Sequence, residues 1–184
     1  TGSSDSIKDL QKQVEQKRKE DLLQLSELLT KNPILAKESE SYQLDTSDPS
    51  QILAQLKETI KKDFPEAPDA NFTVKYVDEA LEDYLSPAFY LTSPIDDYKE
   101  NSIYINEGSH YEKMKLFTTL AHEGFPGHLY QNVFANTSGL PSVRQLLNYS
   151  GYTEGWATYV EGYAYRYAAS LIYDIMKNSA AATS

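Results

Sequence analysis

The chain has no cysteine among its 184 residues. This absence excludes disulfide bonds, thiolate zinc sites and cysteine nucleophiles together. No hydrophobic run is long enough to span a membrane, and no N-terminal signal peptide is visible. The sequence also has no glycine-rich phosphate loop and no nucleophile elbow, so nucleotide-dependent enzymes and serine hydrolases are poorly supported.

Basic residues are in the minority. The 17 Lys and Arg residues are outnumbered by 27 Asp and Glu residues, which gives a formal net charge of −10. The only basic run, Lys17-Arg18-Lys19, lies in a helix of mixed charge, so we expect no nucleic-acid partner. The apolar fraction of 40% is adequate for a core, and the length suits one domain with a helical extension.

Two of the three histidines lie in the segment TTLAHEGFPGHLY, where Glu123 directly follows His122 and His128 comes six residues after His122. Zinc hydrolases use a His-Glu pair on a helix, with a second histidine further on, to place two imidazole ligands and a general base. A spacing of six would put the two rings about 120° apart around an unbroken helix, too far to share an ion. Pro126 and Gly127 can kink the helix and correct this spacing.

A second segment, YTEGWATY, places Glu154 among apolar and aromatic residues at a predicted helix start. Zinc hydrolases of the glutamate-ligand type take their third ligand from a later helix in this manner. Glu161 lies seven residues further along the same helix face. Three interpretations of Glu161 stay open: it supports a histidine ligand, it replaces Glu154 as the ligand, or it is a salt-bridged surface residue.

These two segments resemble the signatures of a bacterial family. HEGFPGHLYQ and TEGWATYVE are similar to HExxPGHxxQ and EGWAxYxE of the domain-of-unknown-function family numbered 885, and the resemblance extends from Phe72 to Arg166. That family is regarded as zincin-like. The resemblance therefore implies a metal-dependent peptidase (a hydrolase) with one zinc ion and a peptide substrate. Family members are several times longer, which implies a fragment whose missing regions are candidate partners, and we favour an extracytoplasmic location, secreted or at the surface.

The predicted roles follow from this resemblance and from zinc chemistry. His122, His128 and Glu154 are the predicted metal ligands, and a fourth position is left for water. Glu123 is the predicted general base. Gln131, three residues after His128, either orients a ligand or faces solvent.

An electrophile facing the oxyanion is also needed. Tyr152, Tyr159 and Tyr163 are candidates that the sequence does not separate, and we provisionally assign Tyr159. Trp156 is interpreted as a packing residue at the start of the helix. His110 is interpreted as a helix-start or surface residue and not as a ligand.

The expected fold is α+β and mostly helical, zincin-like, with a small antiparallel or mixed sheet beside the metal-site helix. A helical extension (1–70) precedes a catalytic core (71–177) and a tail (178–184). Helices are predicted over 6–29, 49–63, 78–85, from 111, and over 154–176, and strands over 71–77, 88–91 and 101–106. The last strand is the candidate sheet edge, where Ile103, Tyr104 and Ile105 would pair with an extended peptide. An ordinary strand of the sheet is the alternative.

Two other functional hypotheses remain open at this stage. The chain could fold and bind metal yet lack the helices that complete a working cleft. It could also be a structural or interaction domain without metal, its His-Glu pair being coincidental. Metal content separates this last hypothesis from the other two.

Overall fold

The computed structural model describes residues 3–33, 46–66, 71–94, 97, 99–108, 113–141, 143–144, 147 and 149–182, so His110 lies outside the described residues. The chain divides into two compact units, 1–43 and 44–184. The predicted division into a helical extension (1–70) and a catalytic core (71–177) stays a prediction. Each unit is described by itself below.

The first unit is built on a single long helix, α1 (Ile7–Lys31). The hydroxyl of Ser6 caps its first turn by accepting a hydrogen bond from the main-chain N–H of Asp9. None of the described residues of α1 is buried. The helix predicted over 6–29 is confirmed. Apolar side chains along it, such as Val14, Leu22 and Leu25, are exposed.

The second unit begins with α3 (Pro49–Thr59), which continues into the short 3-10 helix η1 (Ile60–Lys62). Asp48 caps α3 by accepting the N–H of Ser50 at 2.8 Å, and Pro49 occupies the first turn. One face of this helix is fully buried and contacts α4 and β1. The buried residues are Ile52, Leu53, Leu56 and Ile60.

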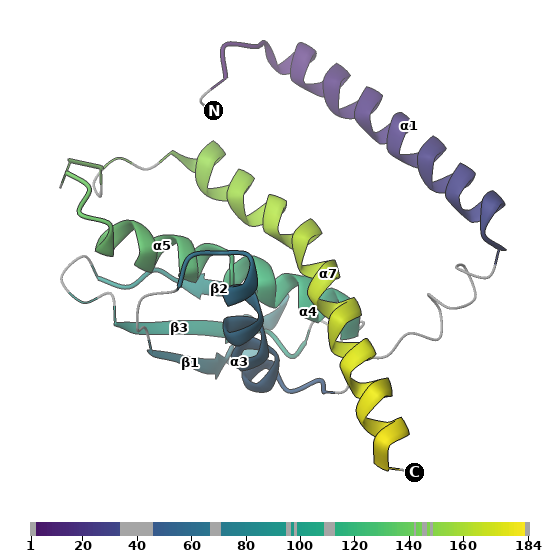
Figure 1. Ribbon diagram of the computed structural model, residues 1–184. Coiled ribbons are helices and arrows are strands. Elements are labelled where there is room, and N and C mark those ends of the chain that lie inside the picture. The colour runs from purple at the N-terminus through teal and green to yellow at the C-terminus, as the bar shows by residue number, and fades with distance from the viewer. Residues whose placement is uncertain are drawn as a thin grey trace. The chain divides into compact units, whose positions relative to one another are not determined.

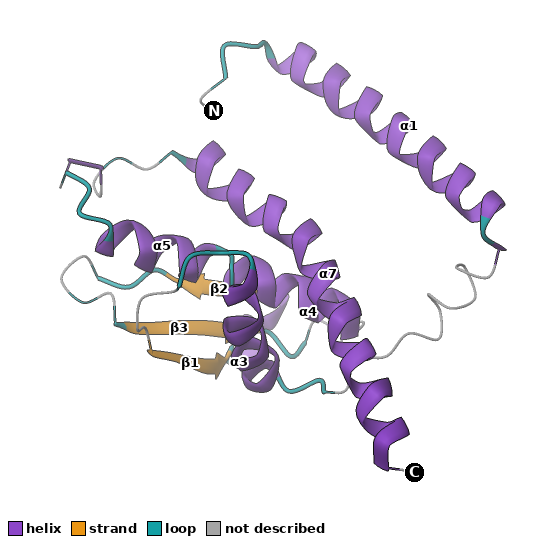
Figure 2. Cartoon of the chain, in the orientation of Figure 1, coloured by secondary structure: helices purple, strands orange, loops and turns teal. Residues whose placement is uncertain are grey.

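A three-stranded mixed sheet forms the other layer of the second unit (Figure 2). Its strands are β1 (Asn71–Tyr76), β2 (Ala88–Leu91) and β3 (Glu100–Ile105), and the 3-10 helix η2 (Glu79–Tyr84) joins the first two. β1 runs parallel to β3, and β2 runs antiparallel to it. The expectation of a mostly helical α+β chain with a small mixed sheet is confirmed.

The position of β3 corrects one prediction. β3 lies between β1 and β2 and pairs with both, so it is the central strand and not an edge (Figure 1). Its backbone hydrogen-bonding groups are already used on both sides, and a peptide cannot add to it. Ile103 and Ile105 are buried in the core, which is the ordinary-strand alternative.

Three helices follow the sheet: α4 (Lys113–Glu123), α5 (His128–Thr137) and α7 (Ser150–Ala182). α7 contacts both α4 and α5. It starts at Ser150, four residues before the predicted position at Glu154. The helix also continues through residues 178–182, where the sequence predicts a tail. Apolar side chains from these helices and from the segment between α4 and α5 form the core beside the sheet, with Leu120, Phe125, Leu129, Val133 and Val160 almost fully buried.

Candidate metal centre

The helical path breaks between α4 and α5, as the Pro-Gly pair predicts. α4 ends at Glu123, the Phe125-Pro126 peptide bond is cis, and Gly127 is the residue before α5. The backbone of Gly127 passes very close to the end of α4. A Cβ atom at Gly127 would lie 1.7 Å from the carbonyl oxygen of His122, so only glycine fits there.

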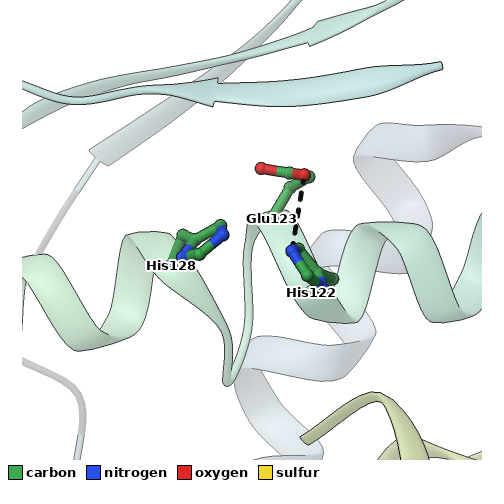
Figure 3. A group of neighbouring side chains, drawn as sticks. All are labelled: His122, Glu123 and His128. Carbon is green, nitrogen blue, oxygen red and sulfur yellow. Dashed lines mark ion pairs between the residues drawn. The ribbon is translucent and has the colours of Figure 1, made fainter. Parts of the chain in front are cut away.

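This break brings the two histidines together. His122 lies in the last turn of α4 and His128 is the first residue of α5, and the rings face each other across the break (Figure 3). The ring centroids are 4.7 Å apart, with 86° between the planes. Their side chains are 17% and 14% exposed, so both rings remain reachable from solvent.

Glu154 joins the two rings from α7. Its Oε2 lies 3.7 Å from Nε2 of His122 and also 3.7 Å from Nε2 of His128. Ligand atoms around a tetrahedral zinc ion, at about 2.0–2.2 Å from it, lie about 3.4 Å from one another. Both distances from Glu154 are thus near the spacing that two ligands of one ion require, and two nitrogens with one oxygen form a donor set that suits zinc.

Glu161, two turns after Glu154 on α7, contacts the other nitrogen of His122. Its Oε1 is hydrogen-bonded to Nδ1 of the His122 ring. A carboxylate accepts this hydrogen bond from Nδ1–H, which leaves Nε2 as the ring nitrogen on the side of Glu154. Glu161 therefore contacts the side of the His122 ring that faces away from Glu154, a position typical of residues that support a metal ligand.

Glu123 is held at the opposite side of the cluster. Its Oε2 accepts the main-chain N–H of Tyr90 on β2 at 2.8 Å, and its Oε1 lies 3.9 Å from Nε2 of His122. One ligand atom each from His122, Glu123 and His128 lie within 4.8 Å of one another, so these three residues also form a possible metal group. The tether to β2 favours Glu123 as a group beside the ion.

Burial shifts the pKa of Glu123 and the pKa of His128, the residues on either side of the break. Burial raises the pKa of the Glu123 carboxyl, and the N–H of Tyr90 and the imidazole of His122 partly oppose that increase. Burial and the neighbouring ring of His122 lower the pKa of His128. His128 is therefore favoured in the neutral form, which is the form that binds a metal.

A cleft of about 930 Å³ opens over this cluster. β2 contributes one part of its wall, and the segment between α5 and α7 contributes another. Lining residues beyond the cluster include Ala88, Tyr90, Gln131, Asn132, Leu140, Arg144, Leu147, Tyr149 and Tyr152. The histidines and glutamates of the cluster are thus accessible to a molecule much larger than water.

Tyr159 does not line the cleft, contrary to its assigned role. Its side chain is 60% exposed, and its ring packs between Trp156 and Tyr163 on a different face of α7. Tyr152, a second candidate for that role, does line the cleft.

The remaining predicted residues also differ in whether they line the cleft. Gln131 lines the cleft, and its Nε2 is buried without a hydrogen-bond partner among the described residues. Tyr104 stacks on Phe89, with ring centroids 5.2 Å apart, and does not line the cleft. Trp156 packs as expected and also donates a hydrogen bond from Nε1 to the carbonyl of Pro126 at 2.8 Å, which ties α7 to the break.

Sequence reasoning missed Tyr90 and Asn132. The hydroxyl of Tyr90 donates to Oδ1 of Asn101 at 2.6 Å and accepts from Nδ2 of Asn132 at 3.0 Å. These bonds link β2 to β3 and α5, and so hold the N–H that contacts Glu123. The role of Tyr90 is played by its main chain, which no side-chain pattern reveals.

Comparison with known proteins places these observations in a family. A family model described as "Bacterial protein of unknown function (DUF885)" matches residues 4–167. The crystal structure of the putative lipoprotein from Colwellia psychrerythraea is similar, with 28% identity and a TM-score of 0.58. The alignment covers 65% of this chain but 21% of that chain. No curated protein matches. Among the described residues, no helix is long and apolar enough to cross a membrane.

Proposed function

The chain belongs to the bacterial family of unknown function DUF885, and we propose that it carries the site of a metal-dependent peptidase. The observation that carries this proposal is the position of Glu154, with Oε2 at 3.7 Å from Nε2 of both His122 and His128. These three residues would hold one divalent ion, with zinc as the proposed metal. Two imidazoles and a carboxylate also suit ferrous iron. The buried carboxylate of Glu123 beside them favours hydrolysis.

Each side chain has a distinct part in the proposed reaction. When bound, a divalent ion supplies a Lewis acid that polarises the scissile carbonyl and makes water more acidic. Glu123 takes a proton from the attacking water, and the oxygen of that water forms a bond to the carbonyl carbon. Glu123 then gives that proton to the amine nitrogen as the C–N bond breaks. The raised pKa of Glu123 suits a group that must both accept and release a proton.

The orientation of Glu123 is supported from two sides. The N–H of Tyr90 fixes Oε2 at 2.8 Å, which leaves Oε1 on the side of His122 for the water. His122 itself is held by Glu161, so that its Nε2 faces the ion. The general base and the ligand are thus both oriented by groups that take no part in bond breaking.

We place the peptide along β2 and not along β3. The N–H of Tyr90 points away from β3, since it bonds to Glu123. In an antiparallel pair the N–H and C=O of one residue point to the same side, so the carbonyl of Tyr90 also faces outward. Ala88, two residues before Tyr90 on the same strand, also directs its N–H and C=O away from β3, and it lines the cleft. The carbonyl of Tyr90 and the main chain of Ala88 can therefore bond to an extended peptide beside the cluster, while the N–H of Tyr90 stays bonded to Glu123.

The location and the missing parts are also proposals. We propose an extracytoplasmic protein, and the support is the similarity to a chain named as a lipoprotein. Because this chain aligns with about a fifth of that structure, regions of a longer chain are proposed to complete the cleft.

The test separates a peptidase from a metal-binding but inactive chain. The zinc-loaded protein is incubated with a mixed library of unmodified peptides, and the products are identified by mass spectrometry. We expect cleavage that is lost in Glu123→Gln, while the zinc content of that variant stays unchanged. Glu107→Gln, an exposed glutamate outside the cleft, is the matched control and should remain active. Zinc binding without cleavage of any peptide by the parent protein would overturn the proposed activity.

A further inference from the structure

One cation in the cleft has no role in the proposed reaction. Among the described residues that line the cleft, Arg144 is the single Lys or Arg. It lies in the segment between α5 and α7, where its main-chain N–H bonds to the carbonyl of Pro141. No ion pair joins its guanidinium to another residue of the described ranges.

The carboxylates of the cleft are already engaged. Glu123 is bound by the N–H of Tyr90, Glu154 faces both histidines, and Glu161 is bonded to His122. The guanidinium of Arg144 is therefore left for an anion that enters the cleft. Arginine prefers carboxylate or phosphate, which it binds through two parallel hydrogen bonds.

The surroundings of Arg144 favour a carboxylate. A phosphate carries more charge and is normally bound by several cations or a nest of main-chain N–H groups, and the lining glutamates would repel it more strongly than they repel a single carboxylate. The same rim instead presents apolar and aromatic side chains: Leu147 is 49% exposed, Tyr149 56% and Tyr152 70%. A peptide residue that combines a carboxylate with an apolar side chain matches both features.

We infer that Arg144 binds a carboxylate of the peptide substrate and thereby selects which peptides enter the cleft. This inference rests on the proposed peptidase function. The carboxylate has two possible sources, the C-terminus of the peptide or an acidic side chain. A C-terminal carboxylate would make the site act near the C-terminal ends of peptides.

The experiment compares four synthetic hexapeptides based on one cleaved sequence. Two differ only at the C-terminus, as free acid or amide, and two amides differ only in one internal Glu or Gln. Binding is measured by calorimetry on zinc-loaded Glu123→Gln, which keeps the substrate intact, and cleavage is measured on the otherwise unchanged protein. Arg144→Gln and Arg144→Lys are introduced into both backgrounds. Arg18→Gln, an exposed arginine of α1, is the matched control.

We expect the peptide that carries the recognised carboxylate to bind about tenfold or more tightly than its neutral counterpart. Arg144→Gln should abolish that difference, Arg144→Lys should restore part of it, and Arg18→Gln should leave it unchanged. Preference for the free acid assigns the C-terminus, and preference for the Glu peptide assigns a side chain. Equal cleavage of all four peptides, unchanged in Arg144→Gln, would overturn this inference and leave the peptidase intact. Absence of cleavage of any library peptide would overturn the proposed function and this inference with it.

Discussion

Glu161 of α7 is hydrogen-bonded to Nδ1 of His122 at the end of α4. This bond joins the two motifs of the sequence across 39 residues and leaves Nε2 of the same ring facing Glu154 and His128. The pair therefore does two things at once. It fixes the tautomer of one proposed ligand, and it anchors the helix that brings the other proposed ligand, Glu154.

Removal of the carboxylate at position 161 should weaken metal binding without unfolding the chain. We expect Glu161→Gln to lower zinc affinity about 10–100-fold, because an amide is a poorer acceptor for the Nδ1 proton. The affinity can be measured by competition with a zinc chelator, and the fold by circular dichroism. Glu58→Gln, at an exposed position of α3, is the control and should bind zinc normally. Unchanged affinity in Glu161→Gln would exclude this role.

The break between α4 and α5 should depend on Gly127. In Gly127→Ala the new Cβ would lie 1.7 Å from the carbonyl of His122 and 2.4 Å from that of Ala121, so the backbone must shift. We expect a loss of at least about 3 kcal/mol in the free energy of unfolding, as in severe overpacking. Urea denaturation of the metal-free protein measures it.

Gly162 provides the matched control for that substitution. It lies inside α7, and nothing would come within 4 Å of an added Cβ. Gly162→Ala should therefore raise the free energy of unfolding by roughly 0.5–1 kcal/mol, since alanine is the better helix former. Equal effects of the two substitutions would show that the close approach at Gly127 is absent.

The tyrosine that faces the oxyanion should be Tyr152 and not Tyr159. Tyr152 lines the cleft, whereas Tyr159 packs on Trp156 outside it. With a peptide that the zinc-loaded protein cleaves, Tyr152→Phe should lower kcat on the order of a hundredfold with little change in KM. Tyr159→Phe should leave both constants unchanged. The reverse result would place Tyr159 at the reacting carbonyl.

Much of the fold follows from local patterns in the sequence. Asp48 and Pro49 predict the start of α3, and the alternation in NFTVKY predicts β1, because both signals depend on neighbouring residues. The order of strands in the sheet is not a local property. The strand at 100–105 looks the same in the sequence whether it lies at an edge or in the centre, and only its pairing with both β1 and β2 reveals its position.

In the candidate site too, features set by neighbouring residues could be predicted, and contacts between distant parts of the chain could not. The spacing of His122 and His128, with Pro126 and Gly127 between them, predicts both the break in the helix and the approach of the two histidine rings. The contacts of Glu123 with the main chain of β2 could not be predicted, because they join positions 33 residues apart through a group that every residue has. The choice between Tyr152 and Tyr159 depends on which side chains of α7 line the cleft, and only the packing of α7 on α4 and α5 reveals that.

Metal content tests the central claim most directly. The purified chain is loaded with zinc, dialysed and analysed by plasma mass spectrometry beside His122→Ala, Glu154→Ala and His110→Ala. We predict about one zinc per chain in the parent and in His110→Ala, and a clear loss in the other two variants. No bound zinc in the parent, or full retention in His122→Ala and Glu154→Ala, would contradict the assignment of this site as a metal centre.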